Sequence, residues 1–300
     1  IYDCHETGVF FDHCNLHQVI ITGNHISYCK RAGIYQYNGD VHNIQITGND
    51  IEYNSGYGGN RDPQQSGEIV LSAPEGIISE YTISGNTLQA TREAPGANVL
   101  VLGKEDGTGT AVRLVTVTGN VLGSRDQNVV ITDGVRISIT GNTIYSGTRR
   151  NIFLADCHTA VLSGNTIATR PANWQSTSRD GISLLRCTGG MVSGNVINDC
   201  HQEEGAVSVR ECRALGIANN QVLDSRALGI AVRDSVGCRI SDNTITELRA
   251  DSQMTKSVRV FGSSLHNVIQ NNLVSAEIEC PAECGQQRAN TSIPAVGGGG

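Results

Sequence analysis

Hydrophobic and polar residues alternate in short runs along this chain, and the runs break at Gly-Asn pairs. In the stretch Ile44–Ile51, isoleucines alternate with polar residues and Gly48-Asn49 stands at the break. A period of two predicts β-strands and not helices. Gly and Asn tolerate positive φ, so the chain can turn sharply between two such strands.

This pattern recurs down nearly the whole chain, at steps of 22 to 37 residues. Ten asparagines occupy the repeated position: Asn24, Asn49, Asn86, Asn120, Asn142, Asn165, Asn195, Asn220, Asn243 and Asn272. A second apolar run precedes each of them and a short third run follows. A motif with this period predicts a solenoid of about ten coils with three strands each. Asparagines stacked at one turn can hydrogen-bond to one another through their side chains.

These features resemble the right-handed parallel β-helix of the pectate-lyase-like superfamily. The resemblance covers roughly residues 1–275, which we predict to be one all-β domain that starts in mid-coil and lacks its N-terminal coils or cap. Residues 276–300 leave the pattern and are expected to form a tail or linker. The superfamily holds polysaccharide lyases, glycoside hydrolases, uronate epimerases, fructan-transforming enzymes, phage tailspikes and adhesins. The resemblance therefore implies a secreted or cell-surface protein with a polysaccharide partner, without identifying the reaction.

Composition argues against nucleic-acid binding, a membrane span and a zinc site. The net charge of −7 argues against a nucleic-acid partner, which requires a basic face. No apolar run approaches the length of a membrane span. Five of the ten cysteines align in two stacks, Cys4 with Cys29 and Cys157 with Cys187 and Cys212, which indicates small buried thiols. A Cys4–Cys29 disulfide is an alternative, and the absence of Cys-x-x-Cys pairs argues against zinc.

Charged residues follow the first strands of five successive coils. Aligning these strands gives a column at the strand ends that reads Asp133, Asp156, Arg186, Glu211 and Asp234. Neighbours in such a column lie about 5 Å apart, and two carboxylates at that distance cannot both ionise cheaply. Asp133 and Asp156 are therefore the candidate acid pair of a glycoside hydrolase, with Arg186 in support. The alternative is structural, because Asp often caps a turn and an Arg between acids is an ordinary surface ladder.

A uronate lyase or epimerase would use a different set of residues. It needs a base for the proton beside the carboxyl group and a cation that neutralises the carboxylate. Lys104 ends a first strand at the centre of the rod and heads an insertion, and Arg125, Arg149, Arg150 and Arg179 lie along the same rim. Calcium held by acids is a possible addition in this interpretation, and no other cofactor is expected. Lys104 could equally be a solvated loop lysine.

The sharper motifs of the superfamily are absent. The sequence contains neither the Asp-Pro-His of alginate epimerases nor the Asn-Thr-Asp, Asp-Asp and Gly-His-Gly set of polygalacturonases. No catalytic residue can therefore be transferred from a known relative.

Insertions border the face that the first strands form, near residues 53–66, 90–97, 103–111, 168–180 and 249–256. Such loops usually carry function. Trp174 and Tyr57 in two of them are candidates for stacking on a sugar ring, although loop packing would explain Trp174 as well. Tyr35, Arg150 and Arg179 are further candidate substrate contacts.

An apolar stretch on the same face requires a cover. It consists of Tyr35, Val70, Leu100, Val130 and Phe153. The insertions could fold over it, or a second subunit could, since homotrimers occur in this superfamily. A non-catalytic glycan-binding tailspike or adhesin segment is the remaining functional alternative.

Overall fold

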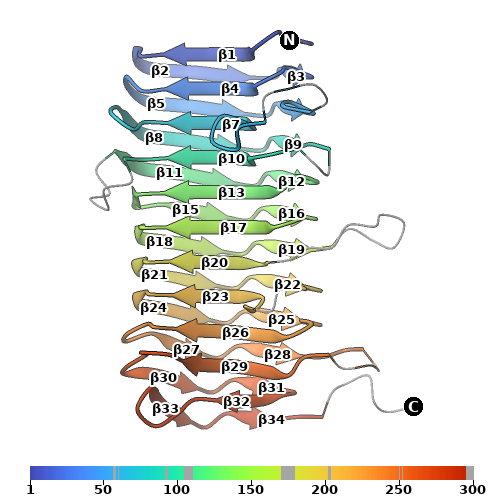
Figure 1. Ribbon diagram of the computed structural model, residues 1–300, viewed down its shortest axis with the longest axis vertical. Coiled ribbons are helices and arrows are strands. Elements are labelled where there is room, and N and C mark those ends of the chain that lie inside the picture. The colour runs from blue at the N-terminus through green and yellow to red at the C-terminus, as the bar shows by residue number, and fades with distance from the viewer. Residues whose placement is uncertain are drawn as a thin grey trace.

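The computed structural model describes residues 1–56, 59, 61–91, 94–104, 111–169, 180–201, 204–249, 251 and 253–294. Every regular element in this part of the chain is a β-strand, and the strands form three parallel sheets along a rod (Figure 1). Successive strands enter the three sheets in turn, which confirms the predicted three-strand coils of a parallel β-helix. The described residues include no helix with the length and hydrophobicity of a membrane span.

The strands are named in chain order. The first sheet contains β1 (Thr7–Asp12), β4 (Ala32–Tyr37), β7 (Gly67–Ser72), β10 (Ala97–Leu102), β13 (Gln127–Thr132), β17 (Arg150–Ala155), β20 (Ile182–Leu185), β23 (Val207–Arg210), β26 (Leu228–Arg233), β29 (Lys256–Phe261) and β32 (Glu277–Glu279). The second contains β2 (Asn15–Thr22), β5 (Asp40–Thr47), β8 (Ile77–Ser84), β11 (Val112–Thr118), β14 (Gly134–Val135), β15 (Ser138–Thr140), β18 (His158–Ser163), β21 (Thr188–Ser193), β24 (Arg213–Ala218), β27 (Arg239–Ser241), β30 (Asn267–Gln270) and β33 (Gly285–Arg288). The third contains β3 (His25–Ser27), β6 (Asp50–Glu52), β9 (Thr87–Gln89), β12 (Val121–Gly123), β16 (Thr143–Tyr145), β19 (Thr166–Ala168), β22 (Val196–Asn198), β25 (Gln221–Leu223), β28 (Thr244–Thr246), β31 (Leu273–Val274) and β34 (Thr291–Ser292).

Aliphatic side chains fill the inside of the coils and stack on their equivalents in the next coil. In the second sheet Ile46 pairs with Ile83, and Ile83 pairs with Val117, with all three fully buried. The alternation along one strand therefore becomes a continuous hydrophobic column along the rod. Burial of each such side chain stabilises the fold by roughly 1.5–3 kcal/mol.

The asparagine column is confirmed as a ladder between the second and third sheets. Asn142 Nδ2 donates to Asn165 Oδ1 at 2.9 Å and to the carbonyl of Val117 at 3.0 Å. Its Oδ1 accepts from the backbone N–H and from Nδ2 of Asn120, each at 3.0 Å. The ladder also includes Asn290, one coil beyond the ten predicted asparagines.

The residue before each ladder asparagine explains the Gly-Asn pairs. Gly119 and Gly141 have φ of +63° and +64°, a conformation that is costly for most side chains. In the degenerate copies Asn219 (φ +56°) and Asp242 (φ +59°) adopt it instead. Asn and Asp tolerate this region better than other non-glycine residues, so the turn survives without glycine.

The chain continues to coil beyond residue 275, where the sequence pattern predicted a tail or linker. β32, β33 and β34 pair with β29, β30 and β31 and make an eleventh coil. Most side chains of β33 are polar and exposed, as the end of a solenoid requires for solubility. Of the expected tail, only residues 295–300 lie outside the described part of the chain.

All ten cysteines are free thiols, so the alternative Cys4–Cys29 disulfide is not formed. The backbone N–H of Cys187 donates to Cys212 Sγ at 3.3 Å, which confirms that they occupy equivalent positions in neighbouring coils. Cys157, Cys187 and Cys212 are all buried.

Hydrogen bonds around a buried ion pair join residues from the connections between the third and first sheets. Arg125 Nη1 lies 2.5 Å from Glu68 Oε1, and both side chains are fully buried. Arg125 also donates to the carbonyls of Asn54 and Pro95, each at 2.9 Å. Burial raises the pKa of Glu68 to about 7, although the neighbouring Arg125 opposes this change.

We expect Asn142→Ala to lower the free energy of unfolding by about 3 kcal/mol, measured by urea denaturation. The backbone N–H and Nδ2 of Asn120 would lose their acceptor, and each buried polar group left unsatisfied costs roughly 1–3 kcal/mol. Thr143→Ala, at the exposed neighbouring position, is the control and should change stability by well under about 1 kcal/mol. Equal losses in the two variants would contradict a stabilising role for the ladder.

Glu68 should make stability depend on pH. Its folded-state pKa of about 7 exceeds the ordinary value of 4.5, so between these values the folded chain binds more protons than the unfolded chain. Stability therefore decreases as the pH rises through this window. Between about pH 5 and about pH 8, the wild-type chain should lose about 2 kcal/mol relative to Glu68→Gln, which lacks this titration. A difference that does not change with pH in urea denaturation would show that Arg125 keeps the carboxylate ionised.

Candidate functional site

The outward face of the first sheet carries most of the candidate residues. Its predicted columns are in register: Tyr35 pairs with Val70, Val70 with Leu100, Leu100 with Val130, and Val130 with Phe153. Neighbouring strands are about 4.8 Å apart. The face is therefore a regular grid of side chains that runs along the rod.

The apolar stretch on this face is covered by the chain itself. Val70, Leu100 and Val130 are 0%, 3% and 5% exposed. Figure 1 shows the connection between β6 and β7 crossing in front of β7, and its Gln64 lines a hollow together with Tyr35. The central residues of the stretch are therefore buried within a single chain, and the β6–β7 insertion lies beside its Tyr35 end.

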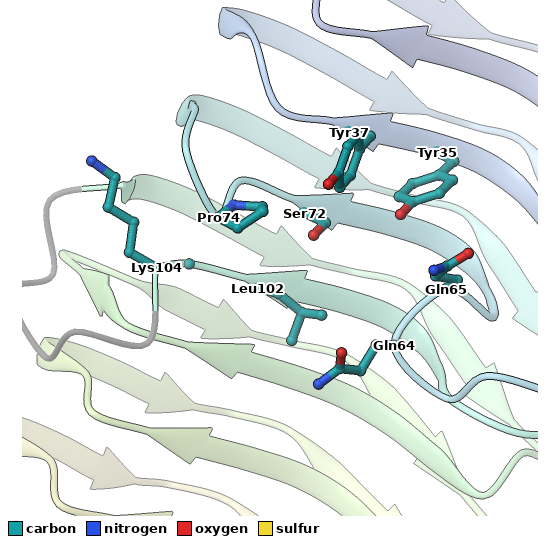
Figure 2. A pocket seen from close by; sticks show the side chains of 9 residues that line it. Tyr35, Tyr37, Gln64, Gln65, Ser72, Pro74, Leu102 and Lys104 are labelled. Atoms are coloured by element: carbon teal, nitrogen blue, oxygen red, sulfur yellow. The ribbon is translucent and has the colours of Figure 1, made fainter.

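The first hollow on this face, the tyrosine hollow, has a volume of about 280 Å³ (Figure 2). It is lined by Tyr35, Tyr37, Gln64, Gln65, Ser72, Pro74, Leu102, Gly103 and Lys104. Burial raises the pKa of Tyr35, so its hydroxyl stays protonated at neutral pH. In Figure 2 the hydroxyls of Tyr35, Tyr37 and Ser72 point to one side, whereas the ammonium group of Lys104 projects away from them. The predicted Lys104 thus borders this hollow without reaching across it.

The second hollow, the arginine hollow, lies over β17, β20 and β23 and has a volume of about 300 Å³. It is lined by Arg149, Arg150, Phe153, Asp180, Ser183, Leu184, Leu185, Glu204, Ser208 and Arg210. Three arginines, two serines and Phe153 therefore line one hollow on the sheet. Seven of the ten lining residues are polar or charged, which suits a polar ligand.

The three arginines of this hollow differ in their partners. Arg149 pairs with Asp126 at 3.1 Å, and Arg210 lies 3.5 Å from Glu211. The guanidinium of Arg150 stands 3.9 Å from the centroid of the Phe153 ring and forms no ion pair within the described part of the chain. Burial and the nearby Arg149 lower the pKa of Arg150, although the carboxylates of Asp180, Glu204 and Asp126 oppose this change.

The predicted charged column is present at the ends of the first-sheet strands. Its five members, Asp133, Asp156, Arg186, Glu211 and Asp234, all have φ between +50° and +56°. Each donates its backbone N–H to the carbonyl at the end of the next strand, so the column is in register. The structure therefore brings these residues together as the aligned turn positions between the first and second sheets.

Their side chains are engaged in turns and ion pairs. Asp133 is fully buried, and its Oδ2 accepts the backbone N–H of Lys104 at 3.2 Å. Arg186 donates two hydrogen bonds to the Asp156 carboxylate, at 2.7 and 2.6 Å. Asp234 caps the next coil by accepting the backbone N–H of Ser263 at 2.7 Å. Asp133 is inaccessible to a sugar in this conformation. The observed contacts are turn caps and a surface ion pair, as in the structural interpretation of this column.

Other predicted residues fall elsewhere. Arg125 does not lie on the rim, because it is fully buried against Glu68. Trp174, Tyr57 and Arg179 lie outside the described residues. Arg150 and Tyr35 line the two hollows, as expected of substrate contacts, although Tyr35 is itself largely buried.

Several lining residues were not singled out by sequence reasoning. Ser183, Ser208 and Arg210 belong to the outward columns, and their polarity among aliphatic neighbours was the available signal. Glu204 lies in the connection before β23, where no insertion was expected. Among the described residues, the one group of three potential metal ligands, His25, Asp50 and Glu52, lies on the third sheet and away from both hollows.

Comparisons with known proteins agree on the architecture. The family model of the right-handed β-helix region matches residues 127–293. The periplasmic alginate epimerase AlgG superposes with a TM-score of 0.56 at 15% identity, covering 91% of this chain and 74% of that chain. The DFA-IIIase from Arthrobacter chlorophenolicus A6 in complex with GF2 superposes with a TM-score of 0.54 at 12% identity, covering 88% and 71%. No curated protein matches the sequence significantly. At these identities the structural likeness shows the fold.

Asp133 should be needed for stability. Asp133→Ala loses the hydrogen bond to Lys104 and places alanine at positive φ, so we expect a loss of about 2 kcal/mol in urea denaturation. Asp133→Asn keeps an acceptor and tolerates the backbone, and should lose less than about 1 kcal/mol. Asp242→Ala is the control, because Asp242 is exposed and also has a positive φ (+59°). If Asp133→Ala cost no more than this control, the turn cap would contribute nothing.

Proposed function

This chain belongs to the right-handed β-helix family, and on that premise we propose that it is a carbohydrate-active protein that binds an acidic polysaccharide along its first sheet. The observation that carries the proposal is the arginine hollow. Its lining holds three arginines against two carboxylates, an excess of one positive charge on a chain whose net charge is −7. Such a local excess of cations favours an anionic ligand.

The chemistry of the hollow fits an acidic sugar unit. A guanidinium group presents a planar fork of donors that matches a carboxylate in bidentate geometry. Arg150 is available for this role because it has no ion pair among the described residues, and the Phe153 ring beneath it positions its guanidinium group. Ser208 adds a hydroxyl for the sugar hydroxyl groups, whereas the Ser183 hydroxyl already donates to Asp180 Oδ2 at 2.8 Å.

The same fold supports a polysaccharide as the partner. AlgG, which shares this architecture, is a periplasmic alginate epimerase, and the DFA-IIIase structure contains GF2. A polymer lying along the rod would meet the tyrosine hollow as well as the arginine hollow, since both lie on the first sheet. We place the protein outside the cytoplasm, in the periplasm or at the cell surface, where such polymers occur.

The reaction that this geometry favours begins with removal of the proton next to the carboxyl group. Arginines that neutralise the carboxylate stabilise the negative charge that develops when this proton leaves. Glu204, an exposed carboxylate on the wall of the hollow, is the acceptor we assign to the proton. Cleavage of the glycosidic C–O bond, with the leaving oxygen taking a proton from solvent, would then make a lyase, and return of a proton to the opposite side of the carbon would make an epimerase. Hydrolysis by Asp133 and Asp156 would require Asp133 to leave its buried turn.

Arg150→Ala should weaken binding of a polyuronate by about 10- to 100-fold, because a hydrogen bond to a charged group contributes roughly 1.5–3 kcal/mol. Isothermal titration with uronate and neutral oligosaccharides of equal length measures this effect. Arg150→Lys should recover part of the affinity, and Arg239→Ala, an exposed arginine on the second sheet, should leave it unchanged. Equal binding of acidic and neutral sugars, or full binding by Arg150→Ala, would overturn the proposal.

Product analysis of the same incubations separates the reactions. A rise in the absorbance of unsaturated uronates identifies a lyase, and exchange of the proton for solvent deuterium without chain cleavage identifies an epimerase. Either activity should be lost in Glu204→Gln. Reducing ends without unsaturation would instead indicate hydrolysis, and binding without any product would indicate a glycan-binding module.

A further inference from the structure

Three different metal-ligating side chains meet on the outward face of the third sheet, near the N-terminal end of the rod. His25 lies on β3, and Asp50 and Glu52 lie on β6. His25 pairs directly with Asp50, and Glu52 stands two residues further along the same strand, hence on the same face. One ligand atom from each residue lies within 4.8 Å of the other two.

Neighbouring side chains orient two of these three groups. Ser27 Oγ lies 2.9 Å from His25 Nε2 and fixes the ring, whose Nδ1 faces Asp50 Oδ2 at 3.0 Å. On the other side, Gln89 Nε2 donates to Glu52 Oε2 at 2.6 Å. The Tyr145 hydroxyl in turn donates to Gln89 Oε1 at 3.2 Å. Partners of this kind set ligand orientation around metal centres.

The backbone that carries the ligands is stiff. β3 and β6 are neighbouring strands of an 11-stranded parallel sheet. The ligand positions are therefore set by strand register and not by a loop, which favours a prearranged site.

We propose that His25, Asp50 and Glu52 form a binding site for a divalent transition metal, with Zn²⁺ as the representative ion. One imidazole and two carboxylates are ligands that Zn²⁺ accepts, whereas Ca²⁺ and Mg²⁺ prefer oxygen ligands throughout. The side chains of His25 and Asp50 are 52% and 49% exposed, so solvent can reach the ion and complete its coordination. The site does not depend on the saccharide proposal, because it lies on a different sheet from both hollows.

The bound ion would join the first coil to the second. His25 belongs to the first coil of the rod, and the two carboxylates belong to the next. An ion that binds only the folded arrangement stabilises it, and the stabilisation grows with the logarithm of the ion concentration above the dissociation constant. Zn²⁺ should therefore raise the melting temperature of the whole chain and slow hydrogen exchange in β3 and β6.

Titration of the chelator-treated chain with Zn²⁺ and with Co²⁺ tests the site. We expect one ion per chain, at least about 100-fold weaker binding in His25→Ala, and about 10-fold weaker binding in Gln89→Ala, which removes only an orienting partner. His13→Ala is the matched control, since His13 is exposed and lies 2.7 Å from Asp12. This variant should bind as the wild type does.

Free thiols are the competing ligands, and Co²⁺ distinguishes them. The Co²⁺ complex of the proposed site should lack the near-ultraviolet charge-transfer band of cobalt–thiolate bonds and should disappear in His25→Ala. Each of three results would overturn the proposal: a thiolate band, unchanged binding in His25→Ala, or no binding by the wild-type chain.

Discussion

The hydrogen bonds of the buried asparagine ladder hold the rest of the structure in place. Each asparagine offers its Oδ1 to the backbone and side chain of the coil before it and donates its own Nδ2 to the coil after it. An amide without these partners would be buried away from water, which is costly. A coil can therefore not slip along its neighbour without breaking two sets of buried bonds. The register of every outward column, and thus of both hollows, follows from this constraint.

The same constraint explains why so much of the fold could be predicted. Ladder and core require the same residue types at each repeat, so the period of two and the Gly-Asn break are visible in the sequence and predict strands, coils and columns. The eleventh coil was missed because the end of a solenoid faces water and loses the hydrophobic signal, as in the polar strand β33. Asn290 follows Asn272 after only 18 residues, a spacing shorter than any other step of the ladder.

The candidate site was less predictable, and Asp133 shows why. Strand alignment identifies which residues stand side by side, and the column from Asp133 to Asp234 was correctly aligned. The inward and outward alternation of side chains along a strand ends at a residue with positive φ. The sequence pattern therefore does not predict whether such a side chain points inward or outward. Asp133 points into the turn, whereas Asp156, one coil later, is partly exposed and bonded to Arg186. Arg125 illustrates a related limit of strand alignment. Its buried partner Glu68 is 57 residues away in the sequence, so only the fold shows that the two form an ion pair in the interior.

The two hollows differ in how firmly the fold holds them, and this difference favours the arginine hollow as the centre of function. One wall of the tyrosine hollow comes from the connection between β6 and β7, an insertion outside the repeat that is held by individual contacts such as Arg125 to Asn54. The floor of the arginine hollow comes from strand residues, among them Phe153, Ser183 and Ser208, whose register is set by the repeat. Groups on such strands keep their spacing without rearrangement when a ligand arrives, so less ordering cost opposes binding. The connection between β6 and β7 shapes the tyrosine hollow, whereas strand register sets the backbone positions of Arg150 and Arg210 in the arginine hollow.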